Sequence, residues 1–159
     1  MDLFNNLVRV GLLAPAALIN DTDTNSKVLD RRGFNRSAIM VYVGDLTGVD
    51  ADSTLELFLQ ESDTTVGTDF TAVPVASMIR DVTGLSSEST AGLFATINAT
   101  SEDLAIFMAE YRGTKRYIRI KADFTTGTGG ITAAYIVATG LLSAAQNAPA
   151  TAPAAITAS

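Results

Sequence analysis

Short apolar runs of strand length recur along the chain, and each gives way to a stretch rich in Gly, Asp, Ser or Thr. Runs of this length between turn residues are typical of β-strands, and a regular series of them is typical of sandwiches and barrels. We therefore expect one all-β domain, an antiparallel β-sandwich of the jelly-roll or Ig-like kind. The runs are Ala16–Ile19, Ala38–Val43, Leu55–Leu59, Val73–Ile79, Leu93–Ile97, Thr114–Asp123 and Ile131–Thr139.

Two of these runs predict more than a strand. Leucine occupies every second position of Leu55–Leu59, which indicates one buried face and one face turned away from the core. Val73–Ile79 contains Pro74, which has no N–H to donate to a neighbouring strand. We expect this second run at a sheet edge or at a bulge.

The segment Ser101–Tyr111 fits two patterns. As a helix, it would begin at a capping Ser101 and show apolar residues at helical spacing. As a strand, its second half, 106–111, would form a hairpin with 114–123 across the turn Arg112-Gly113. The tight turn favours the strand. The apolar residues at helical spacing are Leu104, Phe107, Met108 and Tyr111.

Basic residues concentrate near 112–121, which holds five of the eleven Lys and Arg residues of the chain. Strand alternation there places Ile118, Ile120 and Ala122 toward the core, and a row of polar side chains on the opposite face. Such a row could hold nucleic acid, or could pair with carboxylates such as Glu56 or Glu110 on a neighbouring strand. The formal net charge of −6 opposes a polyanion, so we expect pairing or contact with a protein neighbour. The row consists of Lys115, Tyr117, Arg119 and Lys121.

The usual catalytic and metal-binding side chains are missing from the composition. The chain contains no Cys, which excludes disulfides and thiolate metal sites, and no His, the commonest general base. Gly127–Gly130 is followed by a strand and not by Lys-Ser or Lys-Thr, so it is interpreted as a hairpin loop and not a phosphate site. We expect no enzyme activity, no catalytic residues, no cofactor and no metal.

Two clusters of acidic residues remain as the candidate calcium ligands. Their spacing lacks the EF-hand pattern, and acidic residues in loops are commonly turn residues. We therefore interpret them as solvated turns. The clusters are Asp45, Asp50 and Asp52, and Glu61, Asp63 and Asp69.

Neither a targeting signal nor a membrane segment is evident. Met1–Asn20 lacks a basic start followed by a long apolar run. The most apolar run, Ile131–Leu142, is interrupted by Thr and Gly and is shorter than a bilayer requires. We expect a protein that is neither secreted nor bound to a membrane.

Charged side chains stop at Asp123. Up to Leu142 the neutral sequence predicts a central strand covered on both faces. Residues 143–159 are rich in Ala, Pro and Thr and have too few large side chains for a core of their own. We expect domain 1–142 to carry an extended C-terminal arm, 143–159, that contacts a neighbouring subunit. Candidate contact residues in the arm are Ala148, Pro149, Pro153 and Ile156.

Four stretches resemble the small structural proteins of tailed-bacteriophage heads, in particular decoration or cement proteins. They are Gly33-Phe34 before SAIMVYVG, LELFLQESDT at 55–64, YRGTKRYIRIKADF at 111–124 and GITAAYIVATG at 130–140. The resemblance implies a virion structural protein, made in the host bacterial cytoplasm, that binds the outer capsid surface and clamps neighbouring subunits. It implies the major capsid protein and the chain itself, as a homotrimer, as partners. It also implies no contact with nucleic acid, because DNA lies inside the capsid.

Two alternative functions fit the same fold. A head-to-tail connector or tail-tube subunit of a phage would be recognised by ring symmetry. A carbohydrate-binding β-sandwich would need exposed aromatic side chains, and the chain contains no Trp to provide them. The aromatic residues that could serve are Tyr42, Phe58, Tyr117 and Tyr135.

We predict that nucleic acid does not bind at the basic row, because the net charge of the chain repels it. A gel-shift titration at low salt checks this prediction. Micromolar binding that weakens steeply with salt, and disappears when Lys115, Arg119 and Lys121 are replaced by Ala, would contradict it.

Overall fold

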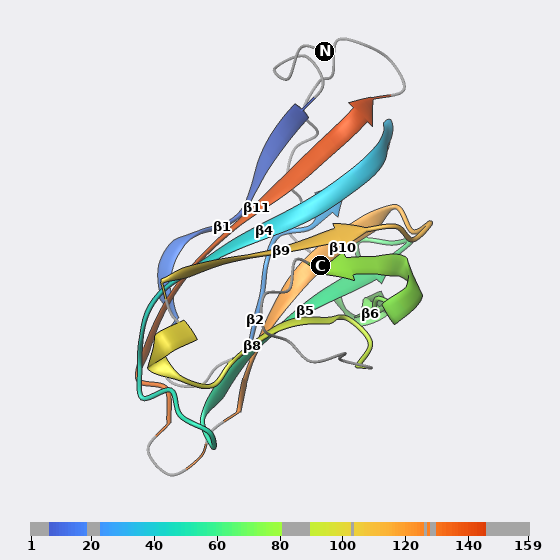
Figure 1. Cartoon of the computed structure of the whole chain (residues 1–159). Coiled ribbons are helices and arrows are strands. Elements are labelled where there is room, and N and C mark those ends of the chain that lie inside the picture. Colours follow the sequence, from blue (N-terminus) through green and yellow to red (C-terminus); the bar gives the residue numbers. More distant parts are fainter. Residues whose placement is uncertain are drawn as a thin grey trace.

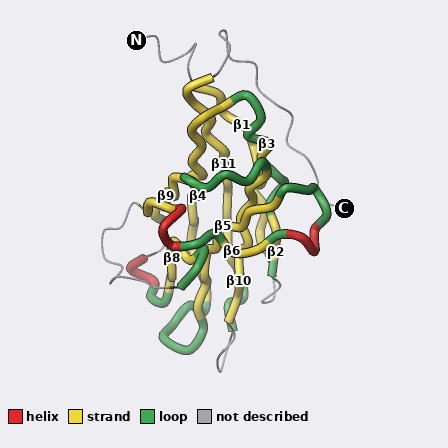
Figure 2. The backbone as a smooth tube through the Cα atoms, turned by 90° about the vertical axis from the view of Figure 1, so that its right-hand side faces the viewer, coloured by secondary structure: helices red, strands yellow, loops and turns green. Residues whose placement is uncertain are grey.

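The computed structural model describes residues 7–18, 23–80, 90–102, 104–125, 127 and 130–145. These residues form two antiparallel β-sheets packed against each other, so the prediction of an all-β sandwich is confirmed (Figure 1). Helical structure in the described segments is limited to short 3₁₀ turns, drawn red in Figure 2. None of the described helices is long and apolar enough to cross a membrane.

The strands divide into sheet A and sheet B. In spatial order, sheet A contains β1 (Leu7–Leu18), β11 (Ala133–Ala145), β4 (Phe34–Thr47), β9 (Ala105–Tyr111) and β7 (Met78–Arg80). Sheet B contains β2 (Thr24–Asn25), β10 (Tyr117–Thr125), β5 (Thr54–Ser62) and β6 (Thr71–Ala72), with β3 (Leu29–Asp30) paired to β10 and β8 (Leu93–Ile97) paired to β5. The 3₁₀ turns are η1 (Gly67–Asp69), η2 (Val75–Ser77) and η3 (Thr100–Glu102).

The strand pairs are nested in the sequence. β1 pairs with β11, β2 with β10, β4 with β9 and β5 with β8, all antiparallel. The chain therefore forms one long double-stranded ribbon that is rolled up, and the pairs β11–β4 and β10–β5 join the turns of the roll. This is the jelly-roll arrangement, which decides between the two kinds of sandwich expected from the sequence.

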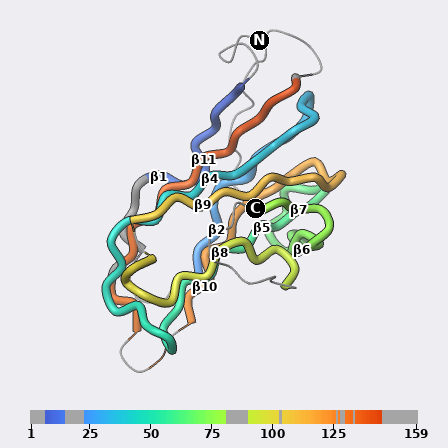
Figure 3. The backbone as a smooth tube through the Cα atoms, viewed as in Figure 1, coloured from blue at the N-terminus to red at the C-terminus, as the bar shows by residue number. Residues whose placement is uncertain are grey.

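Two connections expected to be hairpins cross between the sheets instead. The strand at 106–111 is confirmed as part of β9, but β9 lies in sheet A and β10 in sheet B, so the expected hairpin across Arg112-Gly113 is wrong (Figure 3). β10 in sheet B and β11 in sheet A, which flank the glycine-rich run 127–130, also lie in different sheets, so the expected hairpin is wrong; Thr128 and Gly129 lie outside the described residues. In both cases the buried side chains of the flanking strands belong to the single core between the two sheets.

The core lies between the two sheets. Leu55, Leu57 and Leu59 of β5 are fully buried, as their alternation predicts, and belong to one cluster with Ile39 and Val41 of β4. Burial of each such side chain contributes about 1.5–3 kcal/mol. The expected strand Val73–Ile79 is only partly formed, since η2 occupies Val75–Ser77 and β7 begins at Met78; β7 lies at the edge of sheet A, as expected for a run that contains Pro74.

β11 departs from its prediction in two respects. It is central in sheet A, as expected, but only its inward side chains are buried, so the expected cover on both faces is wrong. The strand continues to Ala145, where it pairs with Phe34, three residues beyond the expected domain boundary at Leu142. The rest of the expected arm, 146–159, lies outside the described residues. β1 begins at Leu7, well before the run expected at Ala16–Ile19.

We predict that Ile120→Ala destabilises the domain by about 2–5 kcal/mol, because Ile120 is buried in the core. Lys121→Ala, a neighbouring change on the partly exposed face, should cost less than about 1 kcal/mol. Denaturant unfolding of both variants measures the difference. Equal costs would show that the strand register is shifted by one residue.

Candidate interaction surfaces

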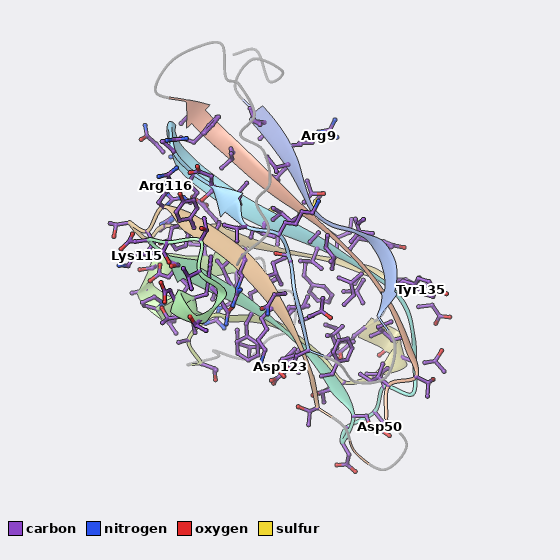
Figure 4. The ribbon with its side chains drawn as sticks, turned by 180° about the vertical axis from the view of Figure 1, so that it is seen from behind. Arg9, Asp50, Lys115, Arg116, Asp123 and Tyr135 are labelled. Atoms are coloured by element: carbon purple, nitrogen blue, oxygen red, sulfur yellow. The ribbon has the colours of Figure 1, made fainter. Side chains whose placement is uncertain are left out.

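Sheet A exposes large apolar side chains on its outer face. Ile106 of β9 is 63% exposed and Tyr135 of β11 is 53% exposed, and Tyr42 of β4 lies between these strands. Figure 4 shows Tyr135 on the outside of the sandwich. We call this surface the apolar face; it consists of Ala38, Met40, Tyr42, Ile106, Met108, Tyr135, Val137 and Leu141.

The strand register makes the apolar face continuous. Tyr42 lies opposite Ile106 and Met40 opposite Met108 in the β4–β9 pair. On the other side of β4, Val137 of β11 lies opposite Tyr42. Side chains directly opposite one another on one face of a sheet are in contact distance. Contiguous exposed apolar surface of this kind marks a site of interaction with another molecule.

The apolar face also contains a shallow groove. It has a volume of about 220 Å³ and lies between β11, β4 and β9, near the end of sheet A where β11 ends. Met108, Ala38 and Leu141 provide apolar lining, while Arg36 and Glu110 provide one charge of each sign. The sequence pattern predicted the strand at 106–111 but did not reveal this surface, because alternation within one strand does not show which strands lie beside it in the sheet.

Two cations of the predicted basic row form ion pairs within the domain. The Lys121 ammonium lies 2.9 Å from Asp23 and 2.6 Å from Asp123. The Lys115 ammonium pairs with Asp63. Pairing with carboxylates is thus confirmed for these two residues, although the partners differ from the expected Glu56 and Glu110. Glu110 instead lies 3.6 Å from Arg112.

The expected exposure of Arg119 is wrong, since the residue is only 7% exposed. Segment 63–70 covers this part of sheet B, and Phe70 stacks on the Arg119 guanidinium at 4.2 Å. Arg119 Nε donates to Gln60 Oε1 at 2.8 Å, and Nη2 donates to the Gly67 carbonyl at 3.1 Å. Burial lowers the pKa of Arg119 from its ordinary value. The side chain is therefore an internal polar anchor for the covering segment.

Tyr117 is also buried, although strand alternation predicted that it would be exposed with the rest of the basic row. Its ring packs in a small cluster with Val28 and Phe70, beneath the same covering segment. The Arg116 guanidinium lies over the Tyr117 ring at 4.6 Å. Of the predicted interface residues, Lys115 and Lys121 are partly exposed, whereas Ala148, Pro149, Pro153 and Ile156 lie outside the described residues.

Tyr111 supports the crossing connection 112–116, which we call the arch. The buried phenol donates to Glu61 Oε2 at 2.5 Å and accepts from the Lys115 N–H at 2.9 Å. Burial, together with the hydrogen bond to Glu61, raises the pKa of Tyr111 above its ordinary value of 10.0. A Cβ on Gly113 would lie 2.3 Å from the Tyr111 oxygen, so only glycine fits the arch at this position.

Arg31 holds the arch from the other side. Its guanidinium lies 4.4 Å from the centre of the Tyr111 ring. Nη1 of Arg31 donates to the carbonyls of Lys115 at 2.6 Å and Gly113 at 3.3 Å. The phenol and the guanidinium together therefore fix the backbone of the arch, a role that nothing in the local sequence pattern indicated.

The acidic residues act mainly as local structural groups. Asp50 Oδ1 accepts from the N–H groups of Asp52 and Ser53, as a turn residue does. Asp69 accepts from the Thr64 hydroxyl. Among the described residues, no group of three acidic side chains is arranged to hold a metal ion.

Comparisons with known proteins add no family. No protein-family model matches the chain, and no curated protein matches it significantly.

We predict that Tyr111→Phe destabilises the domain by about 1–3 kcal/mol, because Glu61 loses a buried donor and the Lys115 N–H loses its acceptor. Tyr42→Phe, which removes an exposed hydroxyl, is the control and should leave stability nearly unchanged. Thermal or urea unfolding of the two variants provides the measurement. Similar effects of the two changes would rule out the structural role of the Tyr111 phenol.

Because the pKa of Tyr111 is raised, the loss of stability caused by Tyr111→Phe should depend on pH. The Tyr111 phenol ionises with its ordinary pKa of 10.0 in the unfolded chain and with a higher pKa in the folded chain. Its contribution to the free energy of unfolding is therefore complete below pH 10 and is lost as the pH rises toward the pKa of the folded chain. The difference in the free energy of unfolding between the wild type and Tyr111→Phe should therefore decrease above about pH 10.

Proposed function

We propose that this chain is a virion structural protein that binds the outside of a tailed-bacteriophage head and stabilises contacts between capsid subunits. Its partners in this proposal are the major capsid protein and further copies of the chain, arranged as a homotrimer. The resemblance of four sequence stretches to decoration proteins gives the functional class. The apolar face of sheet A is the observation that carries the proposal.

The chemistry of the apolar face suits a permanent protein contact. Cores of protein interfaces are rich in aromatic residues and Met and poor in charge. Tyr42, Tyr135 and Met108 provide such side chains at the centre of the face, whereas Arg9, Arg36 and Glu110 lie toward one end. The surface is also carried by paired strands in a rigid sheet, which limits the conformational entropy lost on binding.

A carbohydrate-binding role is the second candidate, favoured by Tyr42 and Tyr135 on the same face. Phe58 and Tyr117, the other aromatic candidates, do not contribute to that surface: Phe58 lies in sheet B, and Tyr117 is buried there. Around the two tyrosines the face presents Ile106 and Val137, which offer no hydrogen bonds to sugar hydroxyls. This lining favours a protein partner over a glycan.

The proposal is tested with heads of the encoding phage assembled without the chain. Wild-type protein should bind these heads in a co-sedimentation assay. Replacing Ile106 and Tyr135 together by Glu should reduce the affinity at least about tenfold, because both charges would be buried in the contact. Both side chains are exposed in the isolated chain, so the variant should fold normally.

The matched control replaces Val66 and Thr68 by Glu, since both are exposed in segment 63–70, which covers sheet B and lies outside the apolar face. This control should bind as the wild type does. Unchanged binding of the Ile106/Tyr135 variant, or absence of wild-type binding, would refute the proposed role of the face. Binding confined to a single ring at one vertex would instead identify a connector.

A further inference from the structure

A second surface, separate from the apolar face, collects positive charge. A shallow groove of about 240 Å³ lies between the turn 31–34 and the arch. Its lining includes Arg31, Arg32, Lys115 and Arg116, with Gly33 and Gly113 between them, and contains no carboxylate. Figure 4 shows Lys115 and Arg116 together at one end of the molecule, far from Asp50.

Backbone contacts hold the two walls of the groove in place. The Arg31 N–H donates to the Arg116 carbonyl at 3.0 Å, which joins the turn to the arch. The turn itself is closed by a bond from the Phe34 N–H to the Arg31 carbonyl at 2.9 Å, with Gly33 at a φ of 87° that glycine adopts readily. The groove is therefore formed before a ligand arrives.

The nearby carboxylates are already engaged by other groups. Asp30, whose side chain is 5% exposed, receives two hydrogen bonds from Arg116, at 3.0 and 2.8 Å. Burial opposes ionisation of Asp30, but these bonds outweigh it and hold its pKa below 3.8. Asp63 pairs with Lys115, and Glu61 accepts from the Tyr111 phenol.

Two guanidinium groups at the groove are only weakly paired with carboxylates or not paired at all. Arg32 is 74% exposed in its side chain and reaches Asp30 only at 3.9 Å. Arg31 has no carboxylate within ion-pair distance among the described residues, and its buried Nε has no hydrogen-bond partner there. Because the Arg31 Nε is buried, the guanidinium that an external acceptor can reach is that of Arg32, and Arg31 adds its positive charge to the groove.

The dimensions and lining favour carboxylates over nucleic acid. Arginine forks bind carboxylates through two parallel hydrogen bonds. A groove of about 240 Å³ holds one or two acidic side chains but not a run of nucleotides. The aromatic residues nearby, Phe34, Tyr111 and Tyr117, are buried and cannot stack on bases.

We propose that this groove binds an acidic peptide segment of a neighbouring protein. The distribution of charge supports such a contact by orienting the molecule. The opposite end of the sandwich carries Asp50, as Figure 4 shows, and Asp52 belongs to the same β4–β5 connection, 48–53, which contains no Lys or Arg. An acidic partner is repelled at that end and attracted at the groove. The inference concerns a different surface from the apolar face and does not depend on the proposed virion role.

The experiment uses the purified full chain and a fluorescent peptide of about six aspartates, long enough to cross the groove. Fluorescence anisotropy at about 20 mM salt should detect binding that weakens as salt increases. Replacing Arg32 and Lys115 together by Glu should weaken binding at least about tenfold. Both residues have exposed side chains, and thermal unfolding verifies that the variant is folded.

Arg9 and Arg36 provide the matched control, because replacing both by Glu changes the net charge equally on exposed positions outside the groove. This control should retain binding within about twofold. If the first variant fails to fold, Arg32→Gln alone replaces it, since that side chain is largely in solvent.

Four results would overturn the proposal. They are absence of binding at low salt, equal binding of a matching asparagine peptide, equal loss in the Arg9/Arg36 control, and tighter binding of a thymidine oligonucleotide of equal length. The last result would identify a phosphate ligand instead of a carboxylate ligand.

Discussion

The pairing of β1 with β11 is the constraint on which the rest of the fold depends. It joins the first and last described strands of the chain, and every other ribbon pair is enclosed between them in the sequence. β11 also pairs with β4 along most of its length, so one strand connects the outer and inner turns of the roll. The core contacts of Leu12 and Ile136 are formed only when this closure is made. Stability of the domain is therefore a property of the closed roll and not of any local hairpin.

The same topology separates the two surfaces that we consider functional. Strands β4 and β10 run the length of the sandwich, so their connections gather at its two ends. The basic groove is built from connections at one end, and Asp50, in the β4–β5 connection, lies at the other (Figure 4). The apolar face is built from strand interiors, where side chains alternate and the outward set can be apolar without affecting the core. The connections at the two ends of the sandwich thus provide the charged surfaces, and the outer face of sheet A provides the apolar surface.

Much of this arrangement could be predicted from residue patterns. The leucines of β5 and the isoleucines of β10 alternate, and alternation correctly identified the strands and their buried side chains. The crossing connections could not be predicted, because the same alternation fits a strand that stays in its sheet and one that leaves it. Burial of Arg119 depends on Phe70 and Gly67, which are distant in sequence and cover the strand only after folding. The groove was missed for the same reason, since Arg31 and Lys115 meet only through the fold.

The position of β11 determines when the apolar face is completed during synthesis. Ribosomes complete β11 after all the other described strands, yet β11 lies between β1 and β4 in sheet A and contributes Tyr135, Val137 and Leu141 to the apolar face. Before β11 is inserted, β1 and β4 have no partner between them, and the apolar face lacks one of its three strands. A nascent or prematurely ended chain that lacks β11 therefore presents an incomplete apolar face. In the proposed role, the fold makes completeness of the polypeptide a condition for binding through this face.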